Sequence, residues 1–440
     1  MNRLRSEIVV VGTGAGGAMV AQKLARAGKD VVIVEQGPDL SKFSGMEAMD
    51  LGRALYQENG KYPKTREGYS LLKGINMGGS TVLAAGHGVR CLADEFKALG
   101  IDLEDAFRET EAELGLQPMP DRHIGPNAGR LIRAAEALNL SVTRWDKFID
   151  FDRCTHCGRC VLTCPIGAKW SSNRVLDKLC VMENVRVLPE TKARAVSISG
   201  GRATGVACET AAGPFEISAD RVVLCAGGLG TPVILQNSGI SAGRHLFMDV
   251  FRVIYGRSPD FASAPEPCMS VVFEEAKNRG YLLFPYVDVA LMFQGIKGWF
   301  GDRPPYGIMV KVKDDNMGEI DKNGRVSKSL TDKDRRRLSE GEALAGKILQ
   351  QAGVPSTAMT VSEPAGGHPG GTAAIGTVVN ADLACKTVKN LYVCDASVFP
   401  ESPGRPPIVT ICALGKWLGK RLAGESDADS KRQRTESDAK

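Results

Sequence analysis

The stretch EIVVVGTGAGGAMVAQKLARAGKDVVIVEQG, residues 7–37, decides the fold. Its apolar run Ile8–Val11 predicts a buried strand, and residues 19–27 predict a helix that ends at Gly28. Val31–Val34 predict a second strand. Together these segments form a β-α-β unit, in which a crossover helix joins two parallel strands of one sheet.

The turn between the first strand and the helix carries the pattern G-x-G-x-x-G at Gly12, Gly14 and Gly17. Such glycines permit a tight turn and the close approach of a pyrophosphate, which the free N–H groups of the helix N-terminus can bind. Glu35 follows the second strand, where a carboxylate takes ribose hydroxyls. A structural turn alone can show the glycine pattern, but the strands, the helix and the acid together favour dinucleotide binding.

The rest of the chain alternates helical and strand-like patterns. Apolar spacing predicts helices over 102–115 and 126–139, and a third from an N-cap at Thr331 to about Ala352. Short apolar runs predict a second sheet within 250–320. Further strands are expected at Val185–Leu188, Ala193–Ser199, Thr204–Glu209, Phe215–Ser218 and Arg221–Cys225. Residues 425–440 are almost entirely polar, so this tail is expected to be disordered.

Composition narrows the class of protein. A chain of 440 residues is too long for one ordinary core and suits two or three modules. The net charge of 56 − 51 = +5 is mild, so nucleic acid is not an expected partner. The sequence lacks an apolar run of transmembrane length and a signal-peptide pattern, so we expect a cytoplasmic protein with reduced thiols.

Four of the twelve cysteines stand close together as Cys154-x2-Cys157-x2-Cys160-x3-Cys164, followed by Pro165. This is the bacterial ferredoxin spacing for a [4Fe–4S] cluster, whereas a structural zinc site usually pairs two separated knuckles. Zinc and unliganded cysteines remain the alternatives. In two-cluster ferredoxins the fourth cysteine ligates the other cluster. The fourth ligand is therefore open between Cys164 and the scattered cysteines, which are Cys91, Cys180, Cys208, Cys225, Cys268, Cys385, Cys394 and Cys412.

Several segments together resemble the glucose–methanol–choline (GMC) family of FAD-dependent oxidoreductases. The opening glycine motif is similar to the family's FAD-binding start, and Gly78-Gly79-Ser80-Thr81 is similar to its loop beside the flavin. HPGGTAAIG from His368 resembles its active-site segment. CAGGLGTPVILQNSGI (225–240) resembles its second signature, and residues 390–419 resemble its C-terminal flavin-binding strand and helix. The resemblance covers most of residues 7–424.

The resemblance implies an α/β fold: a Rossmann-like FAD-binding domain, a discontinuous α+β substrate domain and a small iron–sulfur insertion. The expected boundaries are 1–145, 173–244 and 362–424 for the FAD-binding domain, 146–172 for the cluster insertion, 245–361 for the substrate domain and 425–440 for the tail. Val82 and Leu83 stand where some members attach the flavin to a histidine, so the FAD is expected to be non-covalent. The implied FAD-binding residues are Gly12, Gly14, Gly17, Glu35, Gly78, Gly79, Ser80, Asp395 and Ala396.

The implied activity is an FAD- and [4Fe–4S]-dependent alcohol dehydrogenase. His368 would accept the hydroxyl proton while hydride passes to flavin N5, and electrons would leave through a cluster held by Cys154, Cys157, Cys160 and Cys164 to an external carrier. A cluster favours a dehydrogenase over an oxidase, because oxygen threatens the cluster and competes for electrons.

One departure from the family stands out. The family's second catalytic His or Asn aligns with Pro406, so either Arg405, Glu401 or His87 replaces it, or the substrate needs one polar partner. Two other hypotheses for the function stay open. The chain could be an electron-transfer subunit that works with a partner redox subunit, which the short region 245–361 favours. It could also catalyse the reverse reaction, the reduction of a carbonyl substrate.

Overall fold

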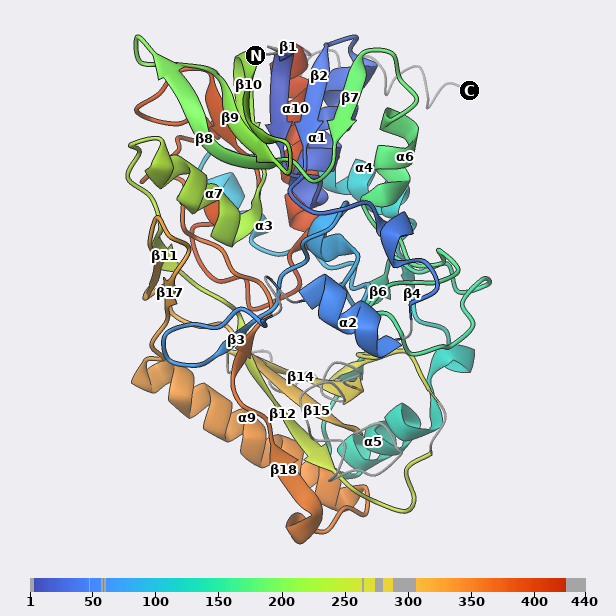
Figure 1. The fold of residues 1–440 in the computed structure, drawn as a ribbon. Helices are drawn as coiled ribbons and strands as arrows, with labels where there is room; N and C mark the ends of the chain where they lie inside the picture. The colour runs from blue at the N-terminus through green and yellow to red at the C-terminus, as the bar shows by residue number, and fades with distance from the viewer. Residues whose placement is uncertain are drawn as a thin grey trace.

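The computed structural model describes residues 4–46, 48–56, 58, 61–262, 265–273, 280–287 and 306–424. Two large sheets organise them, one at each end of the molecule, with the segments that join them between (Figure 1). The predicted tail 425–440 and parts of the region 250–320 lie outside the described residues.

The first sheet has the strand order β7-β2-β1-β10-β9-β8, with β20 paired to β10. β1 runs parallel to both β2 and β10, and β10 runs parallel to β20, so the carboxyl ends of these four strands meet at one edge. The helices α1 (Ala15–Arg26) and α10 (Ile408–Ala423) pack against each other beside this sheet. The strands are β1 (Leu4–Val11), β2 (Val31–Val34), β7 (Val185–Leu188), β8 (Lys192–Ser199), β9 (Arg202–Thr210), β10 (Gly213–Leu224) and β20 (Leu391–Val393).

The predicted β-α-β unit is confirmed, but two strands expected between 215 and 225 form one. β10 pairs antiparallel with β9 through Ser218 and parallel with β1 from Ile217 onward. Ala219 and Asp220 do not end the strand, because β1 continues to pair with it there. A single long strand therefore joins the antiparallel hairpin to the parallel part of the sheet.

The second sheet has the order β3-β19-β12-β15-β14-β13-β5, with β18 paired to β12. The long helix α9 (Asp332–Gln351) crosses one face and buries its apolar side against Ile308 and Val310. The opposite face carries a separate core that includes Phe251, Met309 and Phe284. The strands are β3 (Ser70–Leu71), β5 (Val142–Thr143), β12 (Val250–Gly256), β13 (Val272–Phe273), β14 (Tyr281–Val287), β15 (Tyr306–Val312), β18 (Met359–Val361) and β19 (Ala365–Gly366).

Shorter elements connect the two sheets. The helices are α2 (Ala48–Tyr56), α3 (Ala93–Ala98), α4 (Glu104–Leu114), α5 (Pro126–Ala137), α6 (Asn173–Leu179) and α7 (Gly227–Asn237). The remaining short strands are β4 (Gln117–Pro118), β6 (Asp146–Lys147), β11 (Arg244–Leu246), β16 (Gly318–Ile320) and β17 (Val326–Ser327). No described helix combines the length and the apolar character needed to cross a lipid bilayer.

The predicted N-cap at Thr331 is confirmed and forms a capping box. Thr331 Oγ1 accepts a hydrogen bond from Asp334 N (3.2 Å), and Asp334 Oδ2 accepts one from Thr331 N (3.0 Å). The change Thr331→Ala is expected to lower the free energy of unfolding by about 1 kcal/mol. Urea denaturation followed by circular dichroism measures this loss. Thr331→Ser keeps the hydroxyl and serves as the control, and equal losses in both variants would contradict a role for the cap.

Candidate active site and cysteine site

The glycine turn after β1 is closed on one side and open on the other. A methyl group built on Gly12 would lie 2.3 Å from the carbonyl oxygen of Cys225, and one on Gly17 would lie 1.9 Å from that of Gly12. A methyl group on Gly14 would meet open space. The turn therefore packs tightly against the end of β10 and leaves the N-terminus of α1 accessible, as a bound pyrophosphate requires.

Glu35 holds three loops together at the edge of the first sheet. Its Oε2 accepts hydrogen bonds from Thr13 N (3.0 Å) and Thr13 Oγ1 (2.6 Å), and its Oε1 accepts one from Gly37 N (2.8 Å). Thr13 Oγ1 in turn accepts a hydrogen bond from Gly78 N (3.0 Å). Burial raises the pKa of the Glu35 carboxyl. The sequence motif leaves position 13 unspecified, so the role of Thr13 is visible only in the structure.

The segment Gly78–Ser80 lies on the glycine turn. A methyl group on Gly79 would come 3.3 Å from the Cα atom of Gly14, although 65 residues separate the two positions. Ser80 Oγ accepts a hydrogen bond from Gly74 N (3.1 Å), which fixes the loop. The structure thus brings the two predicted FAD-binding loops into contact.

Asp395 and Ala396 follow β20 at the same edge. Asp395 is buried, and its carboxylate accepts hydrogen bonds from Gly227 N (2.8 Å), Thr231 Oγ1 (2.5 Å) and Ser397 N (2.8 Å). Burial raises the pKa of this carboxyl. The carbonyl of Ala396 accepts a hydrogen bond from Gly371 N (3.0 Å), so the segment that begins at His368 is attached to the end of β20.

His368 follows β19 and exposes about a quarter of its side chain. Its Nδ1 lies 2.9 Å from Asp249 Oδ2 and 2.5 Å from Lys311 Nζ. Its Nε2 forms no hydrogen bond to the described part of the chain. Burial and the charge of Lys311 lower the pKa of His368 to about 4, so the ring is neutral at cellular pH.

Asp249 and Lys311 are buried and form an ion pair behind His368. Lys311 Nζ lies 2.9 Å from Asp249 Oδ2, while Asp249 Oδ1 accepts hydrogen bonds from Ser402 Oγ (2.5 Å) and Gly404 N (3.0 Å). Burial opposes ionisation of Asp249, but the charge of Lys311 and the bond from His368 lower its pKa to about 2. A charged side chain inside an otherwise apolar strand, as in Gly307–Val312, was the available sequence signal for Lys311.

The three residues predicted to replace the missing side chain at Pro406 have other partners. His87 Nε2 hydrogen-bonds the Met269 carbonyl (3.0 Å), and the Arg405 guanidinium lies 5.6 Å above the Trp145 ring. Glu401 pairs with Lys313 at 2.5 Å. None of the three hydrogen-bonds His368 within the described ranges, whereas Lys311 and Asp249 do.

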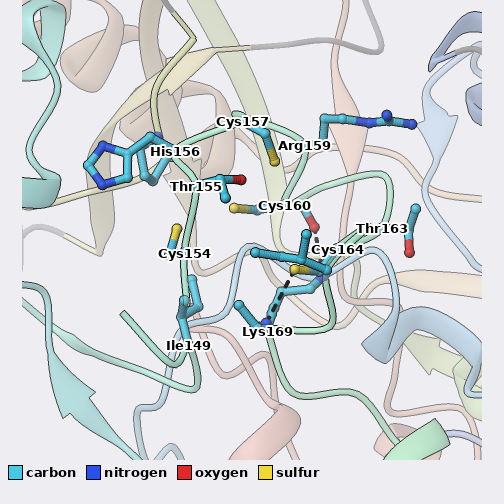
Figure 2. A pocket seen from close by; sticks show the side chains of 13 residues that line it. Ile149, Cys154, Thr155, His156, Cys157, Arg159, Cys160, Thr163, Cys164 and Lys169 are labelled. Carbon is cyan, nitrogen blue, oxygen red and sulfur yellow. Dashed lines mark hydrogen bonds between the residues drawn. The ribbon is translucent and has the colours of Figure 1, made fainter. Parts of the chain in front are cut away.

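The cysteine run forms an irregular loop between β6 and α6. Figure 2 shows the sulfur atoms of Cys154, Cys157, Cys160 and Cys164 around one shared pocket. The backbone N–H of Lys169 donates to Cys164 Sγ (3.4 Å). Across the residues that the structure describes, no group of three or more His, Cys, Asp or Glu side chains is placed to hold a metal ion. The four sulfurs instead surround a common space.

The buried Lys169 lines this pocket, and the buried Lys147 lies near Cys160 and Cys154. Lys169 Nζ donates to the carbonyls of Val82 (2.6 Å), Ala84 (2.7 Å) and Cys160 (2.7 Å). Lys147 Nζ donates to the carbonyls of Ala85 (2.9 Å) and Cys268 (3.2 Å). Burial lowers the pKa of Lys169 to about 8. In the described parts of the chain, neither ammonium has a carboxylate within 4 Å.

Cys268 lies beside the pocket, although it is about a hundred residues from the motif. A hydrogen bond between Cys160 and Cys268, together with the nearby lysines, lowers the pKa of Cys160 to about 6. Other scattered cysteines lie elsewhere: Cys91 hydrogen-bonds Thr410, and Cys225 hydrogen-bonds Cys394 just after the carboxyl ends of β10 and β20. Of the cysteines considered as a fourth ligand, Cys164 lines the pocket, and Cys268 contacts Cys160.

Comparison with known families gives consistent matches. Two family models described as GMC oxidoreductase match residues 52–254 and 321–415. A model described as an NAD(P)-binding Rossmann-like domain matches residues 10–64. The first two models together cover more than half of the chain, including both predicted signature regions around Cys225 and Asp395.

Relatives and solved structures extend these matches over the whole chain. The uncharacterized protein MJ1450 of Methanocaldococcus jannaschii is 29% identical over 429 residues, which cover 94% of this chain and 99% of that protein. Long-chain-alcohol oxidase FAO4A of Arabidopsis thaliana is 25% identical over 501 residues, covering 95% of this chain and 68% of the oxidase. The crystal structure of pyridoxine 4-oxidase from Mesorbium loti superposes with a TM-score of 0.70 at 17% identity, covering 96% of this chain and 100% of that one. Formate oxidase gives a TM-score of 0.71 at 17% identity, covering 97% and 100%. These two structures share the fold.

Proposed function

Because the chain belongs to the GMC oxidoreductase family and is an FAD-dependent oxidoreductase acting on CH–OH groups, we propose that it is an alcohol dehydrogenase with an added [4Fe–4S] cluster. In this proposal the substrate is a small alcohol, and the electrons leave through the cluster to an external carrier. This proposal differs from the activity in the names of the relatives that are called oxidases.

The residues at the edge of the first sheet fit FAD. The open side of Gly14 would receive the pyrophosphate, Glu35 would take ribose hydroxyls, and Gly78–Ser80, Asp395 and Ala396 would border the ring system. Bound FAD supplies the two-electron acceptor for the hydride that leaves the carbinol carbon. The Nε2 of His368 would accept the hydroxyl proton when the neutral ring carries its own proton on Nδ1.

The cluster proposal rests on one observation: two buried lysine side chains, which have no carboxylate partner among the described residues, lie near the cysteine loop. Five buried lysines occur among the described residues, and three of them, Lys311, Lys328 and Lys416, pair with Asp or Glu. Among the described residues, the ammonium nitrogens of Lys147 and Lys169 hydrogen-bond carbonyl oxygens and no carboxylate. A buried charge without a counter-charge is strongly unfavourable. A tetrathiolate iron–sulfur cluster is an anion of the required sign at the required place.

The ligands proposed for the cluster are Cys154, Cys157, Cys160 and Cys164. A cubane presents a separate iron to each cysteine, so its ligands surround a space and need not converge on one ion. The N–H of Lys169 that donates to Cys164 Sγ, and the thiol of Cys268 beside Cys160, would supply hydrogen bonds to cluster sulfurs. When bound, the cluster supplies a one-electron carrier between the flavin site and the surface.

Lys169 also connects the two cofactor sites. Its ammonium joins Val82 and Ala84, which follow the flavin loop Gly78–Thr81, to Cys160 of the cluster loop. The two proposed sites are therefore separated by a short stretch of packed backbone, which supports electron transfer from flavin to cluster within one chain. This connection favours the dehydrogenase over an oxidase that returns both electrons to oxygen.

The test uses anaerobically purified holoprotein and a panel of alcohols. We expect one FAD that is released by acid, about four irons and four sulfides per chain, and bleaching of the flavin absorbance by at least one alcohol. Reoxidation should be faster with a one-electron acceptor dye than with air. An iron-free protein that produces peroxide at every turnover would identify an oxidase instead. Flavin that no alcohol reduces, but that passes electrons to the cluster after chemical reduction, would identify an electron-transfer subunit.

A further inference from the structure

Nδ1 of His368 lies within hydrogen-bond distance of two groups that require opposite protonation states of this nitrogen. Asp249 Oδ2, 2.9 Å away, can only accept a hydrogen bond, so it requires a proton on Nδ1. Lys311 Nζ, 2.5 Å away, donates when it is an ammonium, so it requires a lone pair on Nδ1. A neutral imidazole carries one proton and can satisfy only one of these demands.

The protonation state of Lys311 therefore determines whether Nε2, the other ring nitrogen of His368, is a hydrogen-bond donor or acceptor. With Lys311 charged, Nδ1 accepts its hydrogen bond, the ring proton sits on Nε2, and His368 presents a donor to the open side. With Lys311 neutral, Nδ1–H donates to Asp249, and Nε2 presents the lone pair that a base needs. The ring is a base toward the substrate only in the second state.

We propose that Lys311 is the proton acceptor behind His368 and does the work of the second polar side chain that the family places at the position of Pro406. This inference rests on the proposed alcohol oxidation. The substrate O–H proton binds Nε2 as the C–H electron pair leaves as hydride for the flavin, so the C–O single bond becomes C=O. The Nδ1 proton passes to the neutral amine of Lys311. The ring ends neutral with its proton on Nε2, and Lys311 ends as an ammonium paired with Asp249.

The surroundings favour this transfer. Asp249 with a neutral Lys311 carries one negative charge in the core, and the transferred proton neutralises it. An imidazolium beside an ammonium at 2.5 Å would be strongly repelled, so the proton does not stay on the ring. Burial lowers the pKa of Lys311, which brings the neutral amine within reach.

The other titratable groups near the pair do not supply an alternative acceptor. Asp314 is buried and pairs with Lys328 at 2.9 Å. Cys91 is buried with its thiol against Thr410, and burial raises its pKa to about 12. His87 hydrogen-bonds the Met269 carbonyl, and Arg405 carries a permanent charge above Trp145.

The first experiment reads the tautomer of His368 and needs no substrate. Full-length holoprotein labelled with ¹⁵N-histidine is titrated by NMR, and the resonances of His368 are assigned from a His368→Asn sample. In wild type, we expect His368 to change from the Nε2–H to the Nδ1–H form as pH rises through the pKa of Lys311. Lys311→Met should show Nδ1–H throughout, and Lys311→Arg, which cannot deprotonate, should show Nε2–H throughout. One tautomer shared by all three proteins at every pH would overturn the inference.

The second experiment separates this inference from the proposed function. With the alcohol that bleaches the flavin, the rate of flavin reduction should rise with pH in wild type, because the active form of Lys311 is neutral. Lys311→Arg keeps the charge and should lose about 10²-fold in that rate. If no alcohol bleaches the flavin, the proposed function fails while the NMR result still decides the role of Lys311. A Lys311→Arg rate and pH profile equal to wild type would contradict the proton transfer.

Discussion

The change His368→Ala is expected to slow reduction of the flavin by substrate about 10²- to 10⁴-fold, which is the usual contribution of a positioned general base. FAD binding and the fold should be retained, because the FAD-binding loops are fixed by Glu35, Thr13 and Asp395 rather than by His368. Electron flow from chemically reduced flavin to the cluster should be unchanged, since that step takes no proton from substrate. Rapid-mixing absorbance under anaerobic conditions separates the two steps.

A matched histidine provides the control. His245 is exposed and has a backbone φ of 65°, a conformation that Asn tolerates. His245→Asn should reduce its flavin at the wild-type rate, and His368→Asn should be as slow as the alanine variant. If His368→Ala reduces its flavin as fast as wild type, the base lies elsewhere, and the electron-transfer reading gains support.

The change Cys157→Ser is expected to remove most of the iron and sulfide while leaving one FAD per chain. Serine is a poor ligand for cluster iron, whose usual protein ligands are thiolates. The FAD-binding loops lie at the edge of the first sheet and do not include the cysteine pocket. Iron, sulfide and flavin assays on anaerobically reconstituted protein measure the three contents together.

Cys180→Ser is the control for this loss. Cys180 is exposed at the end of α6 and does not line the pocket. It should retain the full iron content after the same reconstitution. Wild-type protein that takes up one zinc and no sulfide under these conditions would contradict the cluster, as would full iron retention in Cys157→Ser.

The site residues that could be predicted from the sequence are those that lie close together within one short segment of the chain. Gly12, Gly17 and Glu35 belong to one β-α-β unit, and the structure places them together as that pattern predicts. The four clustered cysteines likewise fall within eleven residues and line one pocket. In both cases local spacing along the chain determines proximity in the fold.

The site residues that the sequence did not predict come together through contacts between segments that are distant in the chain. Lys311 reaches His368 because β15 pairs with β12, and Asp249 precedes β12 at the same place. Lys147 and Cys268 are neighbours in the fold, where Lys147 Nζ donates to the Cys268 carbonyl and Cys268 contacts Cys160, although more than a hundred residues separate Lys147 from Cys268 in the chain. Each of these is a single polar residue among apolar residues of the sequence. The adjacent sequence does not indicate which distant residue it contacts in the fold.

The two unpaired ammonium groups of Lys147 and Lys169 have a consequence for the life of the protein in the cell. A ligand that binds only the folded state stabilises it in proportion to the logarithm of its supply, and the proposed iron–sulfur cluster would be such a ligand. Chains made while iron is scarce would keep two buried charges uncompensated and would open more often. Such chains would be degraded sooner, so the abundance of this protein would be expected to follow the iron supply of the cell.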